Sequence, residues 1–280
     1  MLEKNNFLLY LACLSILVFS YSPNLQFNFL YSDDYSYLFP KIGESKDFKI
    51  QANLDSFFEY FYKIGRPLTG YLIFIQNILI ENIEHAKIFR FFSVVLIWFI
   101  FIILYLYLVD KKFSKFESFF ISLSTLSLPV FNLSVSWLTL QQSLLSIIFV
   151  SLSFLSIKNS PFKNSFNYYF RTSLSILLII FSLFLYPVAS MFFFVFYFIE
   201  IFFNFKNKIQ SKTNLNFNLI INPPIIFFST LFLSFLILKF YFNSSGSIEI
   251  NQFKKFLWYF LEIFPLSINF FYPSKSIYYI

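Results

Sequence analysis

Two adjacent carboxylates, Asp33 and Asp34, are the side chains of this sequence best suited to chemistry. They lie in YSDDYSYLF, with tyrosines on both sides, shortly after the first apolar segment of the chain. One acid of such a pair can act as general base on a hydroxyl while the other stays ionised and orients it. The pair can also bind a divalent cation. Alternatively, it is a solvated turn without a chemical role, because Ser-Asp-Asp is also a helix-cap and turn signal.

A basic cluster follows in KIGRPLTGYL, where Lys63 precedes Gly65, Arg66 and Pro67. Glycine permits close approach of the backbone and proline suits the first position of a helix, so Arg66 is presented at a helix start. A guanidinium there can hold a phosphate through two hydrogen bonds, or it can anchor the chain to lipid headgroups. For Arg90, at the start of the next apolar segment, anchoring is the preferred interpretation and phosphate binding the alternative.

Other reactive or ionisable side chains are sparse in the apolar segments. His85 is the only histidine and Cys13 the only cysteine, so the sequence predicts neither a histidine-based metal cluster nor an intramolecular disulfide. Cys13 is expected to be a small lipid-facing residue. Glu200 and Lys239 are expected close to a membrane face, which leaves the spans almost uncharged. That pattern disfavours an ion-coupled transporter, because the coupling ion needs ligands at mid-membrane.

The elements that must position these residues are membrane-spanning helices. Hydrophobic residues make up 58% of the chain and charged ones only 12%, against about 25% charged residues in soluble domains. A spanning helix needs about 20 apolar residues. The sequence therefore predicts an all-α transmembrane bundle of about seven spans, the last of which Pro223 and Pro224 kink or start. The predicted spans are 7–22, 88–109, 118–134, 138–157, 172–186, 188–203 and 219–241.

The positive charges predict which connections lie inside. Lys and Arg concentrate in the short connections that share a side with the N-terminus, which makes that side cytoplasmic. The acid-rich segment 23–87, with Asp33 and Asp34, then lies outside. Within it, the apolar stretch 66–80 gives only about 21 Å of helix, too short for a hydrocarbon core of about 30 Å. We expect a helix in the outer interface. Its predicted lipid-facing residues are Tyr71, Phe74, Ile75, Ile78 and Leu79.

The order of these features resembles a known family. An acidic pair after the first span (YSDDYSYLF), a Gly-Arg-Pro-Leu box on an interfacial helix (GRPLTGYL) and a charged step into the second span (ENIEHAKIFRFFSVV) resemble the GT-C class of membrane glycosyltransferases. The similarity is greatest to bacterial O-antigen glucosyltransferase-type proteins, which use polyprenyl-phosphate sugars. It covers roughly residues 1–105, and beyond that only the span pattern agrees. Residues 1–241 would form the GT-C-like core. Residues 242–280 would form an external tail or an eighth span. Because such enzymes usually continue with more spans or an external domain, a truncated or degenerate enzyme is an alternative to a complete one.

The resemblance implies a reaction and roles for its residues. Asp33 or Asp34 would be the catalytic base, and Arg66, with Lys63 or Arg90, would bind the phosphate of a polyprenyl-phosphate sugar. The acceptor would be a glycan, lipid or protein at the outer face of the bacterial cytoplasmic (inner) membrane. Besides membrane lipids no further partner is expected, nucleic acid included, and a divalent cation at Asp33 and Asp34 is the one cofactor considered. The alternatives are a non-enzymatic lipid or glycan translocator and a polymerase-like protein of envelope polysaccharide assembly.

Overall fold

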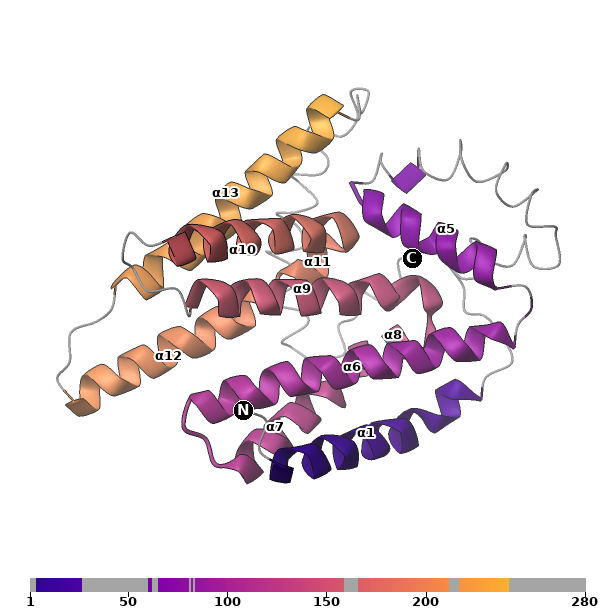
Figure 1. Ribbon diagram of the computed structural model, residues 1–280, viewed down its shortest axis with the longest axis horizontal. Coiled ribbons are helices and arrows are strands. Elements are labelled where there is room, and N and C mark those ends of the chain that lie inside the picture. The colour runs from indigo at the N-terminus through magenta and orange to yellow at the C-terminus, as the bar shows by residue number, and fades with distance from the viewer. Residues whose placement is uncertain are drawn as a thin grey trace, which may run out of the picture.

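The computed structural model describes residues 4–26, 60–61, 65–80, 82, 84–158, 166–211 and 217–241 of the chain. Within these ranges the chain is helical and contains no strand (Figure 1). Asp33, Asp34, Lys63 and residues 242–280 lie outside the described residues. The helices are α1 (Lys4–Leu25), α5 (Pro67–Leu79), α6 (His85–Asp110), α7 (Lys115–Leu126), α8 (Pro129–Ser136), the 3-10 helix η2 (Leu138–Leu140), α9 (Gln141–Lys158), α10 (Phe166–Leu185), α11 (Pro187–Ser190), α12 (Phe193–Ser211) and α13 (Phe217–Tyr241).

The long apolar helices confirm the predicted all-α bundle of about seven spans. In the described part of the chain, 6 helices are long and apolar enough to cross a membrane, or 7 if the bent pair of α7 and α8 is one span. Each predicted span falls on one of these helices or on that pair. Pro223 and Pro224 lie inside α13 rather than at its start, because the helix already begins at Phe217.

The third span is broken, and the break has a local cause. α7 and α8 meet at 57°. Pro129 lies in the first turn of α8, where its missing N–H is tolerated, but it cannot continue a helix from α7. At the break, Tyr21 Oη donates a hydrogen bond of 2.7 Å to the carbonyl of Leu126, the last residue of α7. A side chain of α1 thus binds a carbonyl that the break has released.

α5 is the short amphipathic helix that the sequence predicted. It has 13 residues, too few for a span. Tyr71, Ile75 and Leu79 are exposed, and Phe74 and Ile78, also predicted to face lipid, are half-buried. The opposite face is buried in the bundle and is partly polar. Its residues are Pro67, Thr69, Gly70, Ile73, Gln76 and Asn77.

Two contacts with α8 place the end of α1 and the start of α6 at the same end of the bundle. Asn24, near the end of α1, donates a hydrogen bond to the side chain of Asn132. Arg90, near the start of α6, donates to the carbonyl of Ser136, one turn further along α8. The chain therefore leaves α1 and enters α6 at the same end of the bundle. We call this the α5 end, and the opposite end, where α6 finishes near Glu200 of α12, the Glu200 end.

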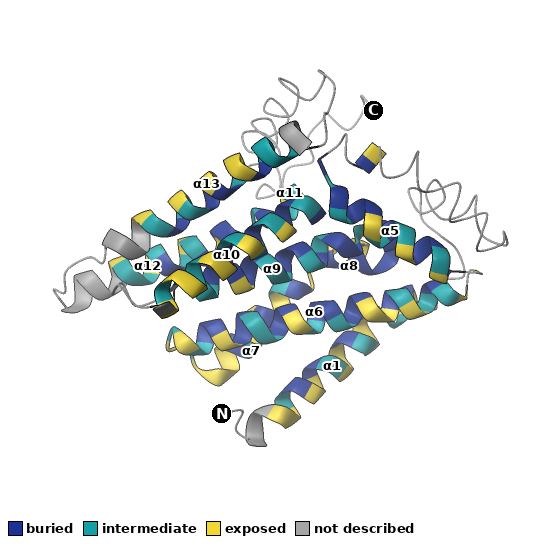
Figure 2. Cartoon of the chain, turned by 45° about the horizontal axis from the view of Figure 1, so that its top comes forward, coloured by how far each residue is buried: buried dark blue, intermediate teal, exposed yellow. Residues whose placement is uncertain are grey.

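The core of the bundle corrects one expectation. α1 packs on α6 through a stripe at helical spacing that includes Tyr10, Cys13, Leu17 and Tyr21. Cys13 is 0% exposed, so the prediction that it faces lipid was wrong. Its small side chain fits between the two helices. Figure 2, which colours each residue by burial, shows exposed residues alternating with buried ones along the helices.

Serine hydroxyls join α9 to α10. Ser146 Oγ lies 2.7 Å from Ser182 Oγ, and Ser153 Oγ lies 2.6 Å from Ser175 Oγ. All four residues are buried. Small hydroxyl side chains let helix backbones approach closely in a membrane and hydrogen-bond across the interface.

Cysteine labelling tests the path of the chain. In a Cys13→Ala background, Gln26→Cys, Asn82→Cys and Lys112→Cys each place one thiol at an exposed position. With a membrane-impermeant maleimide on sealed vesicles, we expect the first two thiols to react from one face and the third from the other. Labelling of positions 26 and 82 from opposite faces would mean that the chain crosses the membrane between them.

Candidate functional site

The α5 end gathers the points at which helices stop. α8 finishes at Ser136, η2 intervenes and α9 begins at Gln141, while α10 finishes at Leu185. The last carbonyls of a helix lack partners within that helix. In a membrane protein they need hydrogen-bond donors from elsewhere in the chain. Side chains of α5 and α6 supply several of these donors.

The paired amides of Gln76 and Gln141 connect three helices. Gln76 Nε2, from the last turn of α5, donates to Gln141 Oε1 at 2.7 Å and to the Leu138 carbonyl at 3.3 Å. Gln141 Nε2 in turn donates to Ser93 Oγ at 2.7 Å and to the Phe89 carbonyl, both on α6. These contacts fix the C-terminal half of α5 against α6 and α9.

Arg66 is held at the other end of α5. Gly65 has φ 77°, a left-handed conformation that favours glycine, and Pro67 opens the helix, as the sequence predicted. The Arg66 guanidinium lies 4.3 Å from the centre of the Tyr186 ring, in a cation–π contact. Thr69 Oγ1 donates to the Leu185 carbonyl. Arg66 remains partly exposed, so it can contact a ligand as well as the ring.

Arg90 has a different environment from the one expected. It is 0% exposed, so it does not anchor the chain to lipid headgroups. Its Nε donates to the Ser136 carbonyl at 3.4 Å, where the positive charge also favours the C-terminus of α8. Sequence reasoning failed here because position along the chain does not reveal which side of α6 meets α8.

The two predicted phosphate-binding arginines contact different elements. Arg66, which precedes the first residue of α5, lies on the Tyr186 ring, whereas Arg90 donates to the Ser136 carbonyl of α8. A phosphate shared by the two arginines stays a prediction. Lys63, the remaining candidate, lies outside the described residues.

Two buried amides next to this pair have no hydrogen-bond partner in the described structure. Both amide atoms of Asn77 and both of Gln142 lack one, as does Oε1 of Gln76. Asn77 is 2% exposed and Gln142 is 0% exposed. Sequence reasoning missed these residues. The available signal was the adjacent amides inside apolar runs, QN in IFIQNILI and QQ in LTLQQSLL.

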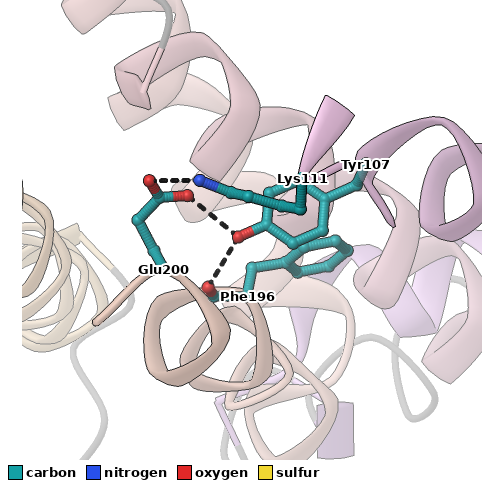
Figure 3. A network of polar contacts seen from close by, with 4 residues as sticks. All are labelled: Tyr107, Lys111, Phe196 and Glu200. Atoms are coloured by element: carbon teal, nitrogen blue, oxygen red, sulfur yellow. Dashed lines mark hydrogen bonds and ion pairs between the residues drawn. The ribbon is translucent and has the colours of Figure 1, made fainter. Parts of the chain in front are cut away.

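The Glu200 end carries a buried ion pair (Figure 3). Lys111 Nζ, just past the end of α6, donates to Glu200 Oε1 at 2.5 Å. Tyr107 Oη donates to Glu200 Oε2 at 3.0 Å and to the Phe196 carbonyl at 3.1 Å. Glu200 lies near the end of the bundle as predicted, but its pairing with Lys111 was not predicted. The network ties the end of α6 to α12.

Metal ligands do not gather in the part of the chain that the structure describes. No group of three His, Cys, Asp or Glu side chains is close enough there to hold a metal ion. The divalent-cation site at Asp33 and Asp34 lies outside the described residues and stays a prediction.

The ion pair at the Glu200 end should contribute to stability through both partners. Glu200→Ala removes one charge of a buried pair, which typically costs about 3–5 kcal/mol. We expect a fall of about 3 kcal/mol in the free energy of unfolding in bicelles. In the double variant Lys111→Met with Glu200→Leu the free energy of unfolding should fall much less, because neither charge remains buried. The exposed Glu84→Ala is the control. Equal losses in the single and double variants would show that the pair is not coupled.

The candidate site is thus the α5 end, with the half-buried Arg66 on Tyr186, the buried Arg90 at Ser136 and the unpartnered amides. These groups can bind an anion and a ligand that both donates and accepts hydrogen bonds. No family model, curated protein or solved structure matches this chain.

Proposed function

We propose that the protein is a membrane glycosyltransferase that uses a polyprenyl-phosphate sugar at the outer face of a bacterial cytoplasmic membrane. The observation that carries the proposal is the half-buried Arg66. A left-handed Gly65 and the Tyr186 ring hold it at the end of the bundle from which the acidic segment departs. The sequence resemblance to GT-C enzymes adds the expected roles. The acceptor is a glycan, lipid or protein.

The covalent tether supports placing the acids and the arginine in one site. Asp33 and Asp34 follow Gln26 so closely that the extended chain between them measures at most about 28 Å. The 26-residue helix α6 is about 39 Å long. A chain leaving the α5 end therefore cannot carry these acids as far as the Glu200 end.

The reaction divides between the acids and Arg66. Asp33 or Asp34 accepts the proton of an acceptor hydroxyl. As the proton leaves, the hydroxyl oxygen of the acceptor forms a bond to the anomeric carbon of the sugar. The bond between that carbon and the phosphate oxygen breaks, and polyprenyl phosphate leaves with the electron pair. The Arg66 guanidinium stabilises the charge on the departing phosphate. The apolar outer faces of the helices accommodate the lipid tail.

The serines between α9, α10 and α11 give no support to a translocator. Ser146, Ser182 and Ser190 bond to one another and to helix carbonyls. Their hydrogen bonds join helices, so these three hydroxyls are not free to line a path for a polar substrate. We therefore prefer the enzyme over the non-enzymatic alternative.

Neutralising the acids tests the catalytic step. Asp33→Asn and Asp34→Asn are made singly. In one of the two variants the rate of sugar transfer should fall by a factor of about 10² or more, which is the usual contribution of a positioned base. Transfer from radiolabelled polyprenyl-phosphate hexoses to envelope fractions provides the measurement. Asp47→Asn, in the same segment, is the matched control. Full transfer by both variants, or no transfer by the parent protein, would refute the proposal.

Replacing Arg66 tests the phosphate contact. Arg66→Ala should raise the KM for the donor about tenfold or more, because a charge-assisted hydrogen bond contributes about 1.5–3 kcal/mol. Arg66→Lys should restore only part of the lost donor affinity, because an ammonium group cannot form the two parallel hydrogen bonds that a guanidinium forms with a phosphate. Tyr186→Phe, which keeps the ring under the guanidinium, should behave like the parent. An unchanged KM in Arg66→Ala would remove Arg66 from the site.

A further inference from the structure

The α5 end contains two adjacent amide pairs that meet at one contact. Gln76 and Asn77 lie in the last turns of α5, and Gln141 and Gln142 open α9. The contact is the 2.7 Å hydrogen bond from Gln76 Nε2 to Gln141 Oε1. Because consecutive Cα atoms are 3.8 Å apart, Asn77 and Gln142 each lie one residue from this contact.

The remaining amide atoms are buried without partners in the described structure. They comprise two donor groups, Asn77 Nδ2 and Gln142 Nε2, and three acceptors, the side-chain oxygens of Gln76, Asn77 and Gln142. A buried polar group left unpaired destabilises a protein, and more than about nine in ten find a partner. Buried atoms without a partner occur elsewhere in the described structure as well, for example Tyr10 Oη and Ser122 Oγ, but at this end five of them fall on three amide side chains.

Helical geometry relates Gln142 to Arg66. Gln142 is one turn before Ser146 on the same face of α9. Ser146 Oγ donates to the Tyr186 carbonyl at 3.1 Å, and the ring of Tyr186 lies under the Arg66 guanidinium. Gln142 is therefore one helical turn from Ser146, which itself contacts Tyr186, the residue whose ring supports Arg66.

Asn77 belongs to the buried face of α5 on the other side of the amide contact. Ile73 and Ile80, one turn away on either side, pack in one cluster with Leu138 of η2 and Ala86 of α6. The two unpartnered amides thus come from different helices at the same end of the molecule.

The mixture of donors and acceptors selects the chemistry of the ligand. The phosphodiester of a lipid-linked sugar accepts hydrogen bonds but has no proton for the three amide oxygens. A metal ion would satisfy the oxygens and not the NH₂ groups, and a lipid tail would satisfy neither. A hydroxyl both donates and accepts. Vicinal hydroxyls, as in a sugar ring, match the adjacent oxygen and nitrogen of an amide.

We propose that Asn77 and Gln142 bind the hydroxyl groups of the donor sugar, so that sugar recognition by these amides is separate from phosphate binding by Arg66. This inference rests on the proposed function. It assigns specificity to residues of α5 and α9 rather than to the acidic segment. Gln76 shares its free oxygen with the same ligand while its nitrogen holds Gln141.

The test compares binding of lipids with and without a sugar. The probes are polyprenyl phosphate and its glucose, mannose and galactose derivatives, each in competition with a fluorescent polyprenyl phosphate in detergent. The parent protein should bind at least one sugar-bearing lipid with a Kd about tenfold lower than that of the bare lipid phosphate. A tenfold difference in Kd corresponds to the net contribution of one or two hydrogen bonds. Asn77→Leu and Gln142→Leu should each remove most of this preference while binding the bare lipid as the parent does. Asn167→Leu, at an exposed site on α10, is the control.

Thermal unfolding of the same variants separates recognition from a structural role. Leucine removes the unpartnered amides, so the melting temperature should stay the same or rise. A lower melting temperature with an unchanged preference would show that the amides hold structural water only, and would overturn the inference. A parent that binds all lipids equally also overturns it while leaving phosphate binding in place. A parent that binds none of them contradicts the proposed function itself.

Discussion

The capture of backbone carbonyls by side chains from other helices is the interaction on which the rest of this bundle depends. Lipid offers no hydrogen bonds to a helix that stops or bends. Tyr21 therefore binds the Leu126 carbonyl at the α7–α8 break, Arg90 binds Ser136, and Gln76 binds Leu138. Each contact is made between elements far apart in the sequence. The Gln76 contact, with the contact from Thr69 to the Leu185 carbonyl, attaches the short helix α5 to the bundle.

The long helices could be predicted from sequence because they follow from local properties. Apolar length located every span, and the helix start at Pro67 followed from residue type alone. The faces of the helices could not be predicted in the same way. Cys13 and Arg90 lie in apolar or interfacial positions by sequence, yet both are fully buried. α6 packs against α1 on the side of Cys13, and α8 meets α6 at Arg90. Hydropathy does not predict which face of a helix packs against another helix, because that depends on the tertiary structure.

The candidate site also combines features that local sequence predicts with features that only the packing of the helices reveals. The turn that presents Arg66 was predictable, but its Tyr186 partner comes from a break between α10 and α11 that has no local relation to it. The amides of Asn77 and Gln142 were visible as polar residues in apolar runs, but only the bundle shows that they are buried and unpartnered. A polar residue in a membrane helix becomes informative once its neighbours fail to satisfy it.

Under the proposed function, the α5 end, and not the Glu200 end, binds a lipid-linked sugar. Photoaffinity labelling with a polyprenyl-phosphate hexose that carries a diazirine beside the phosphate tests this location. We expect adducts on Arg66 to Tyr71 and on Tyr186 to Ser190, suppressed by excess unmodified lipid. Adducts concentrated around Lys111 and Glu200, or adducts that the unmodified lipid does not suppress, would contradict it.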